Sequence, residues 1–173
     1  MIGHLEKQPP ILSTVLFEQV PSEAFVPLTN LADLDLSDNT FSTLGPHPFS
    51  SLSQLVSLNL HGCSLNDLDQ AAFSNLTGLK HLDISNNFLD YIPGGSSLNK
   101  LDHLEVLRAG SNRLTEIKEF DMSALTNLKY LVIEGCSQGR SSGNGELQIH
   151  QNAFLSNTKL VQVNITKVNY HLK

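Results

Sequence analysis

Hydrophobic residues recur along this chain with a period of about 24 residues. The clearest unit places apolar residues at Leu31, Leu34, Leu36 and Phe41, with Asn39 between the last two. Further units repeat this spacing at Leu55, Leu58, Leu60, Cys63 and Leu65; at Leu79, Leu82, Ile84, Asn87 and Leu89; at Leu104, Leu107, Ala109, Asn112 and Leu114; at Leu128, Leu131, Ile133 and Cys136; and, in worn form, at Leu160, Val163 and Ile165. Such a period predicts a solenoid in which each repeat buries its apolar side against the next.

Each unit contains an alternating segment in which an outward residue separates two apolar ones. This alternation is the pattern of a short β-strand with one buried face. A large ring recurs later in the unit, at Phe25, Phe49, Phe73 and Phe154. Because a single repeat cannot cover such a ring, we expect stacked coils to bury these phenylalanines on the side away from the strands.

Two units depart from the regular length. The unit that starts at Leu79 is one residue longer, and Gly-Gly-Ser-Ser at 94–97 replaces the usual phenylalanine region, so we expect a loosened back in that coil. A Gly/Ser-rich insertion at 137–146 predicts a flexible loop that leaves the solenoid after a strand. We expect one solenoid over 1–173, made of a degenerate repeat at 7–30, repeats at 31–54, 55–78, 79–103, 104–127 and 128–159, and a partial repeat at 160–173.

The pattern L-x-x-L-x-L-x-x-N/C-x-L, with a phenylalanine before the next unit, resembles the typical 24-residue extracellular subtype of leucine-rich-repeat proteins, such as Toll-like receptor ectodomains. The resemblance implies an α/β solenoid, a horseshoe with a short parallel β-sheet on the concave face and irregular or short-helical segments on the convex side. It also implies a ladder of buried side chains at Asn39, Cys63, Asn87, Asn112 and Cys136. Extracellular relatives close both ends with cysteine-rich caps, which this sequence lacks, so we expect a fragment of a longer protein.

The two cysteines occupy ladder positions three coils apart. Strands stack about 4.8 Å apart, so the sulfur atoms are predicted to lie roughly 14 Å from each other, too far for a disulfide. We interpret Cys63 and Cys136 as buried thiols that act as small apolar side chains.

Charge excludes some classes of partner. The formal net charge is −6, the wrong sign for a protein that binds nucleic acid or an anionic membrane. No segment has the roughly 18 apolar residues of a membrane span, so we expect no direct membrane insertion, and the first ten residues lack the apolar core of a signal peptide.

No signature of catalysis is present. The sequence contains no G-x-S-x-G, G-x-x-x-x-G-K, H-E-x-x-H or paired C-x-x-C motif, so we expect neither an enzyme nor a cofactor. His61, His81, Asp35 and Asp83 are predicted on neighbouring strands, but the histidines fall in different columns, and a solvated polar face is the favoured interpretation over a metal site.

The outward strand positions form two columns across the predicted sheet. One column is Asp33, Ser57, His81, Val106, Tyr130 and Gln162, and the other is Asp35, Asn59, Asp83, Arg108, Val132 and Asn164. The last strands combine apolar and aromatic residues with polar neighbours, the composition of a binding hot spot. The candidate binding residues are His81, Asp83, Val106, Arg108, Tyr130, Val132, Glu134 and Gln162. The alternative is that Tyr130 and Val132 only strengthen the sheet by packing between neighbouring strands.

We interpret the chain as a recognition module that binds a protein or peptide ligand through its concave face, as part of a cell-surface receptor ectodomain, with receptor dimerisation as a further possibility. Two N-x-S/T sequons, at Asn75 and Asn164, are weak support for an extracellular location. The alternatives are an extracellular-matrix or adhesion protein and an intracellular scaffold or regulator.

Overall fold

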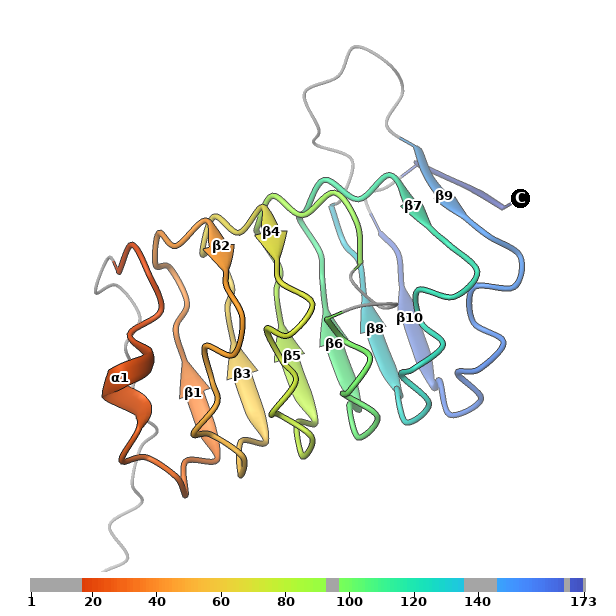
Figure 1. Ribbon diagram of the computed structural model, residues 1–173. Helices are drawn as coiled ribbons and strands as arrows, with labels where there is room; N and C mark the ends of the chain where they lie inside the picture. Colours follow the sequence, from red (N-terminus) through yellow and green to blue (C-terminus); the bar gives the residue numbers. More distant parts are fainter. Residues whose placement is uncertain (1–16, 93–96, 136–145, 167–168, 173) are drawn as a thin grey trace, which may run out of the picture.

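The chain forms a continuous stack of coils with parallel strands and little helix (Figure 1). The computed structural model describes residues 17–92, 97–135, 146–166 and 169–172. Six strands form the sheet of the concave face, in the order β1-β3-β5-β6-β8-β10. They are β1 (Asp33–Asp35), β3 (Ser57–Asn59), β5 (His81–Asp83), β6 (Val106–Arg108), β8 (Tyr130–Val132) and β10 (Gln162–Asn164). The chain is therefore a solenoid of parallel strands with little helix, as the period predicted.

The central residue of each strand points into the core. Leu58, Leu82 and Leu107 are register partners across β3, β5 and β6, and their side chains are 1%, 1% and 0% exposed. The buried apolar residues of successive coils form one continuous cluster. In β10 the corresponding residue, Val163, is 38% exposed, so this burial weakens at the last strand of the sheet.

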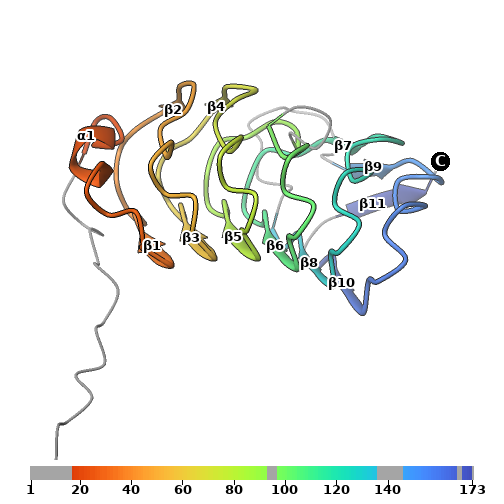
Figure 2. The same cartoon turned by 60° about the horizontal axis from the view of Figure 1, so that its bottom comes forward.

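Further strands, of two to four residues, lie along a second side of the coils (Figure 2). One parallel pair joins β2 (Thr43–Leu44) to β4 (Asp67–Leu68), and a three-stranded sheet has the order β11-β9-β7. Its members are β7 (Glu116–Ile117), β9 (Glu146–Ile149) and β11 (Asn169–Leu172). Near the start of the described chain, a single helical turn, α1 (Ser22–Phe25), buries its last residue.

Phenylalanine rings stack along the convex side of the first coils. The ring centroids of Phe25 and Phe49 lie 6.4 Å apart, as do those of Phe49 and Phe73, and all three rings are buried. Phe154 is only partly buried, so the predicted row of buried rings does not extend unchanged to the last coil.

The back of the coil at 79–103 corrects one expectation. Leu98 takes the phenylalanine position one residue later than in the neighbouring coils and is fully buried. Ser97 is also buried, and its Oγ donates a hydrogen bond to the carbonyl of Asp69 at 2.7 Å. The prediction of a loosened back was therefore wrong for these residues, because a leucine and an inter-coil hydrogen bond close the coil. Residues 93–96 lie outside the described part of the chain, as do 137–145 of the predicted loop.

A left-handed corner follows five strands of the concave sheet, namely β1, β3, β5, β6 and β8. The residue just before the ladder position has a positive φ in each coil, between 51° and 71°. These residues are Asp38, Gly62, Asn86, Ser111 and Gly135. The left-handed region turns the chain away from the sheet at the same point in each coil, which keeps the coils superimposable.

Candidate binding site on the concave face

The register places the outward residues in the two predicted columns. Val106 is the partner of both His81 and Tyr130, and Tyr130 is also the partner of Gln162. In the second column Arg108 pairs with Asp83 and Val132, and Val132 pairs with Asn164. The alternation of apolar and outward residues in the sequence thus correctly predicted which side chains share this surface.

The polar residues of the first strands stabilise turns. The Oδ1 atoms of Asp35, Asn59 and Asp83 each accept a hydrogen bond from the backbone N–H two residues later, at 2.9, 3.0 and 2.9 Å. This is the Asx turn, in which a short polar side chain substitutes for a backbone partner. Asp83 also accepts a bond from the Ser85 hydroxyl. These side chains therefore have a structural role at the ends of β1, β3 and β5.

Arg108 and Val132 stand at the same column position in β6 and β8. Neither side chain has an oxygen with which to form the Asx turn, so the turn does not explain these residue types. A depression of about 320 Å³ lies on the sheet at this place. It is lined by Val106, Arg108, Tyr130, Leu131, Val132, Glu134, Gln162 and Asn164. Six of the eight predicted binding residues line this depression.

The depression combines an aromatic ring, aliphatic walls and a free cation. Tyr130 is 41% exposed, and both its register partner Val106 on β6 and Val132, two residues further along β8, are half-buried. Arg108 is exposed and makes no ion pair with any residue in the described part of the chain. An aromatic residue among aliphatic ones, next to a guanidinium with unused donors, has the composition of a protein contact site.

Hydrogen bonds hold the polar rim of the depression. The Asn164 Nδ2 donates to Glu134 Oε1 at 2.6 Å, which links the end of β10 to the turn after β8. Gly110 permits a close approach at the same place, because a Cβ there would lie 2.7 Å from the Glu134 carbonyl oxygen. At the other end of the strands, Lys129 Nζ lies 2.7 Å from Glu105 Oε2, and this hydrogen bond lowers the pKa of Glu105.

The two remaining predicted residues border the next depression. A hollow of about 210 Å³ lies over β3, β5 and β6, and His81 and Asp83 line it together with Val106 and Arg108. The two depressions therefore meet at β6. A larger one, of about 420 Å³, lies away from this sheet between residues 18–22 and 42–48, where small polar and proline side chains line it without an aromatic ring.

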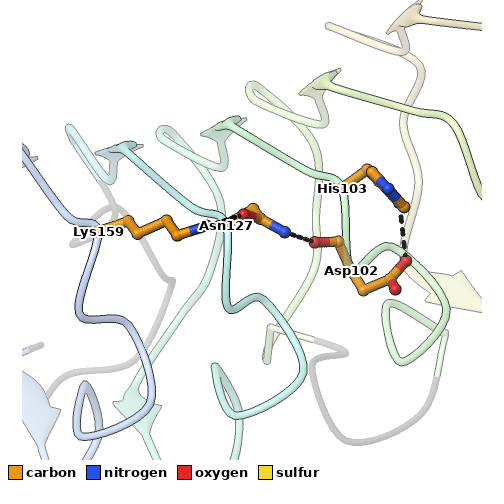
Figure 3. A network of polar contacts seen from close by, with 4 residues as sticks. All are labelled: Asp102, His103, Asn127 and Lys159. Atoms are coloured by element: carbon orange, nitrogen blue, oxygen red, sulfur yellow. Dashed lines mark hydrogen bonds and ion pairs between the residues drawn. The ribbon is translucent and has the colours of Figure 1, made fainter.

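Polar side chains also connect neighbouring coils in the segments that precede the strands (Figure 3). Asn127 Nδ2 donates to the Asp102 carbonyl at 2.6 Å, and Lys159 Nζ donates to Asn127 Oδ1. His103 Nδ1 lies 3.1 Å from Asp102 Oδ1. These residues precede β6, β8 and β10, so the network joins the three coils whose strands form the depression. Exposed contacts of this kind add little stability each.

The ladder positions satisfy backbone groups between coils. Asn87 is buried, and its Nδ2 donates to the carbonyls of Leu60 and Ile84 at 2.9 and 3.0 Å, while its Oδ1 accepts from the Leu65 N–H at 2.9 Å. Asn39 and Asn112 accept in the same way from Phe17 and Leu89. Cys63, at the equivalent position, has only its thiol, whose Sγ lies 3.0 Å from the Leu36 carbonyl oxygen and 3.6 Å from that of His61. Cys136 lies outside the described residues.

A histidine, a serine and an aspartate also lie next to one another on this surface. His61 Nδ1 lies 2.9 Å from the Ser85 hydroxyl, which in turn donates to Asp83. The serine stands between the histidine and the carboxylate, whereas a catalytic triad needs the histidine in the middle. Within the described ranges, no three metal-binding side chains come together and no helix is long and apolar enough to cross a membrane.

The two sequon asparagines differ in their surroundings. Asn75 is exposed on the convex side, where its Oδ1 accepts a hydrogen bond from the Ser74 hydroxyl. Asn164 is half-buried in the rim of the depression and uses its Nδ2 to bind Glu134. A glycan on Asn164 would replace that contact, whereas Asn75 leaves its Nδ2 free of partners in the described structure.

Comparison with known proteins agrees with this architecture. The family model for leucine rich repeats matches residues 11–65 and 54–100, more than half of the chain. The chain therefore belongs to the leucine-rich-repeat family.

Its relatives include extracellular and cell-surface proteins. It is 34% identical to the transforming growth factor beta activator LRRC33 of Danio rerio over 131 residues, which are 70% of this chain and 18% of the relative. It is 33% identical to Toll-like receptor 5 of Homo sapiens over 108 residues, 61% of this chain and 13% of the receptor. It is 34% identical to vasorin of Mus musculus over 111 residues, 64% of this chain and 16% of that protein. The chain thus spans less than a fifth of the length of each of these relatives.

Proposed function

We propose that this chain is a protein-recognition module of an extracellular or cell-surface leucine-rich-repeat protein, and that it binds a protein ligand at the depression over β6, β8 and β10. The observation that carries the proposal is that Tyr130 lines one depression together with the half-buried Val106 and Val132 and with Arg108, which forms no ion pair in the described structure. The likeness to receptors supports the extracellular assignment. The exposed Asn75 on the convex side is compatible with it.

The alternative role of Tyr130, packing within the sheet, makes a different prediction about binding. Tyr130 is 41% exposed, so a large part of its ring is not used in contacts between strands. If packing were its main role, a polar substitution would lower the stability of the sheet. If it anchors a ligand, the same substitution would lower affinity while leaving stability nearly unchanged, because exposed positions change stability by about 0.5 kcal/mol or less.

A photo-cross-linking amino acid at Gln162, on the rim, is the means to identify the partner on cells. The captured protein is then titrated against wild-type chain and Tyr130→Asp. We expect Tyr130→Asp to weaken binding by about 30-fold, equivalent to roughly 2 kcal/mol for loss of an aromatic anchor. Leu155→Asp is the matched control, because Leu155 is 71% exposed on the convex side. Equal affinities of the wild type and Tyr130→Asp would contradict the proposed site.

A further inference from the structure

Charge is distributed unevenly across the concave face. Asp33 on β1 and Asp38 just after it are both exposed, and neither carboxylate forms an ion pair or a side-chain hydrogen bond in the described structure. Asp35 and Asp83 differ, since each gives an oxygen to its Asx turn. Arg108 is the single arginine or lysine in the two outward columns. The β1 end of the face is therefore acidic, and its carboxylates Asp33 and Asp38 have no ion-pair partner in the described structure.

The apolar side chains lie at the opposite end. Tyr130, Val106 and Val132 surround the depression, while the outward residues of β1 and β3 are all polar. At this end Glu134 is held by Asn164, and Arg108 supplies positive charge between the depression and the acidic strands. A basic group of a ligand is repelled near Arg108 and attracted beyond it, toward Asp33 and Asp38. The face thus has a direction, from an apolar anchor site to an acidic end.

The register sets the distance between the two ends. β1 and β8 are separated by β3, β5 and β6, so four strand spacings of about 4.8 Å give roughly 19 Å. An extended chain advances about 3.3 Å per residue, and roughly six residues therefore span this distance.

We propose that the partner contacts this face through an extended segment that carries a bulky apolar side chain and, about six residues away, a lysine or arginine. The apolar side chain occupies the depression beside Tyr130. The basic side chain is attracted to the acidic end of the face, where it pairs with Asp33 or with Asp38. This assignment of ligand chemistry rests on the proposed function, because it uses the same depression as the anchor site.

The test is a selection of displayed random peptides of roughly 12 residues, long enough to span the face, on the immobilised chain. Selected peptides are synthesised and titrated against wild type, Tyr130→Asp, and the double variant Asp33→Asn/Asp38→Asn. The matched control is Glu23→Gln/Asp90→Asn, which removes two exposed carboxylates elsewhere on the molecule. Thermal unfolding of each variant verifies that the fold is retained.

We expect the enriched peptides to share an apolar residue and a basic residue about six positions apart. Their affinity should fall about tenfold for Asp33→Asn/Asp38→Asn and remain unchanged for the control. Peptides that depend on Tyr130 but lack the basic residue, or bind the double variant as tightly as wild type, would overturn this inference and leave the proposed site intact. Peptides indifferent to Tyr130→Asp would instead overturn the proposed function. A selection without any binder would overturn the inference that a short segment suffices.

Discussion

At the scale of single residues, the ladder shows how one side chain serves two coils. Asn87 bonds backbone groups of its own coil and of the preceding one, so each amide replaces sheet partners that the turning chain lacks. Cys63 is the exception, since a thiol donates one weak hydrogen bond and is a poor acceptor. Among the described ladder positions, Cys63 therefore makes the weakest hydrogen bonds between coils.

An asparagine at position 63 should strengthen the hydrogen bonding between these coils. Cys63→Asn is expected to raise the free energy of unfolding by about 1 kcal/mol, the net value of an added buried hydrogen bond. Urea denaturation at neutral pH measures the change. Cys63→Ala, which removes the thiol without adding an amide, is the control and is expected to be less stable than wild type. A lower midpoint for Cys63→Asn would show that the amide does not fit this position.

The same substitution should also remove a dependence on pH. Burial, and secondarily the charges of Asp38 and Asp35, raise the pKa of the Cys63 thiol to about 11, against 9.0 in the unfolded chain. Since the unfolded thiol ionises first, the stability contributed by the neutral thiol is complete below pH 9 and is lost as the pH rises toward 11. The wild-type midpoint should fall in this window relative to Cys63→Asn. Cys136 is present in both proteins and cancels from the comparison.

At the scale of the strand and its corner, the left-handed residue is the element that repeats most strictly. It has a positive φ in five successive coils, although it is glycine in only two of them, Gly62 and Gly135. Aspartate, asparagine and serine occupy it elsewhere, which is consistent with the tolerance of short polar side chains for this conformation. Geometry is thus conserved from coil to coil where residue type is not.

Gly62 offers a direct test of this corner. Gly62→Ala forces an L side chain to adopt a φ of 66°, with its Cβ 2.5 Å from Asp38 Oδ1, and should cost about 1–2 kcal/mol. Gly78→Ala is the matched control, because its Cβ would approach only the Leu55 carbonyl, at 3.8 Å, without a positive φ. Chemical denaturation compares the two variants. Equal stability of Gly62→Ala and wild type would show that the corner relaxes freely.

The sequence predicted the strands and their outward columns because alternation alone determines which side chains point away from the core. It did not predict the Asx turns of Asp35 and Asp83 or the left-handed corners. Those depend on backbone angles that several residue types adopt, so no single letter marks them. It also misjudged the coil containing Leu98, where a shift of one residue hid a buried leucine in the phenylalanine position. The depth of the depression depends on relative side-chain sizes, which a pattern of apolar positions does not contain.

At the scale of the whole molecule, each coil is stable only through its neighbours. Phe49 stacks on Phe25 on one side and on Phe73 on the other, whereas Phe25 has one ring neighbour in the described structure. A solenoid of this kind gains stability from the interfaces between adjacent coils. The interior coils should therefore be more sensitive to truncation than the first one.

Two substitutions of the same chemical type measure this difference. Phe49→Ala should lower the free energy of unfolding by about 4 kcal/mol, the usual cost of emptying a buried aromatic site. Phe25→Ala should cost about 1 kcal/mol less, because it breaks one ring contact instead of two. Equilibrium unfolding of both variants gives the comparison. Equal losses would mean that ring stacking adds nothing to the burial of each side chain.

The constant register of the sheet has a consequence for how this surface can change. The extra residue of the coil at 79–103 leaves Leu82 directly opposite Leu107, so it is accommodated outside the strands. Outward side chains therefore keep the same register across the sheet even when the connecting segments vary in length. Substitution at outward positions such as Tyr130 and Arg108 can change the binding specificity without altering the fold. The same property makes the chain suitable for the design of new binding proteins.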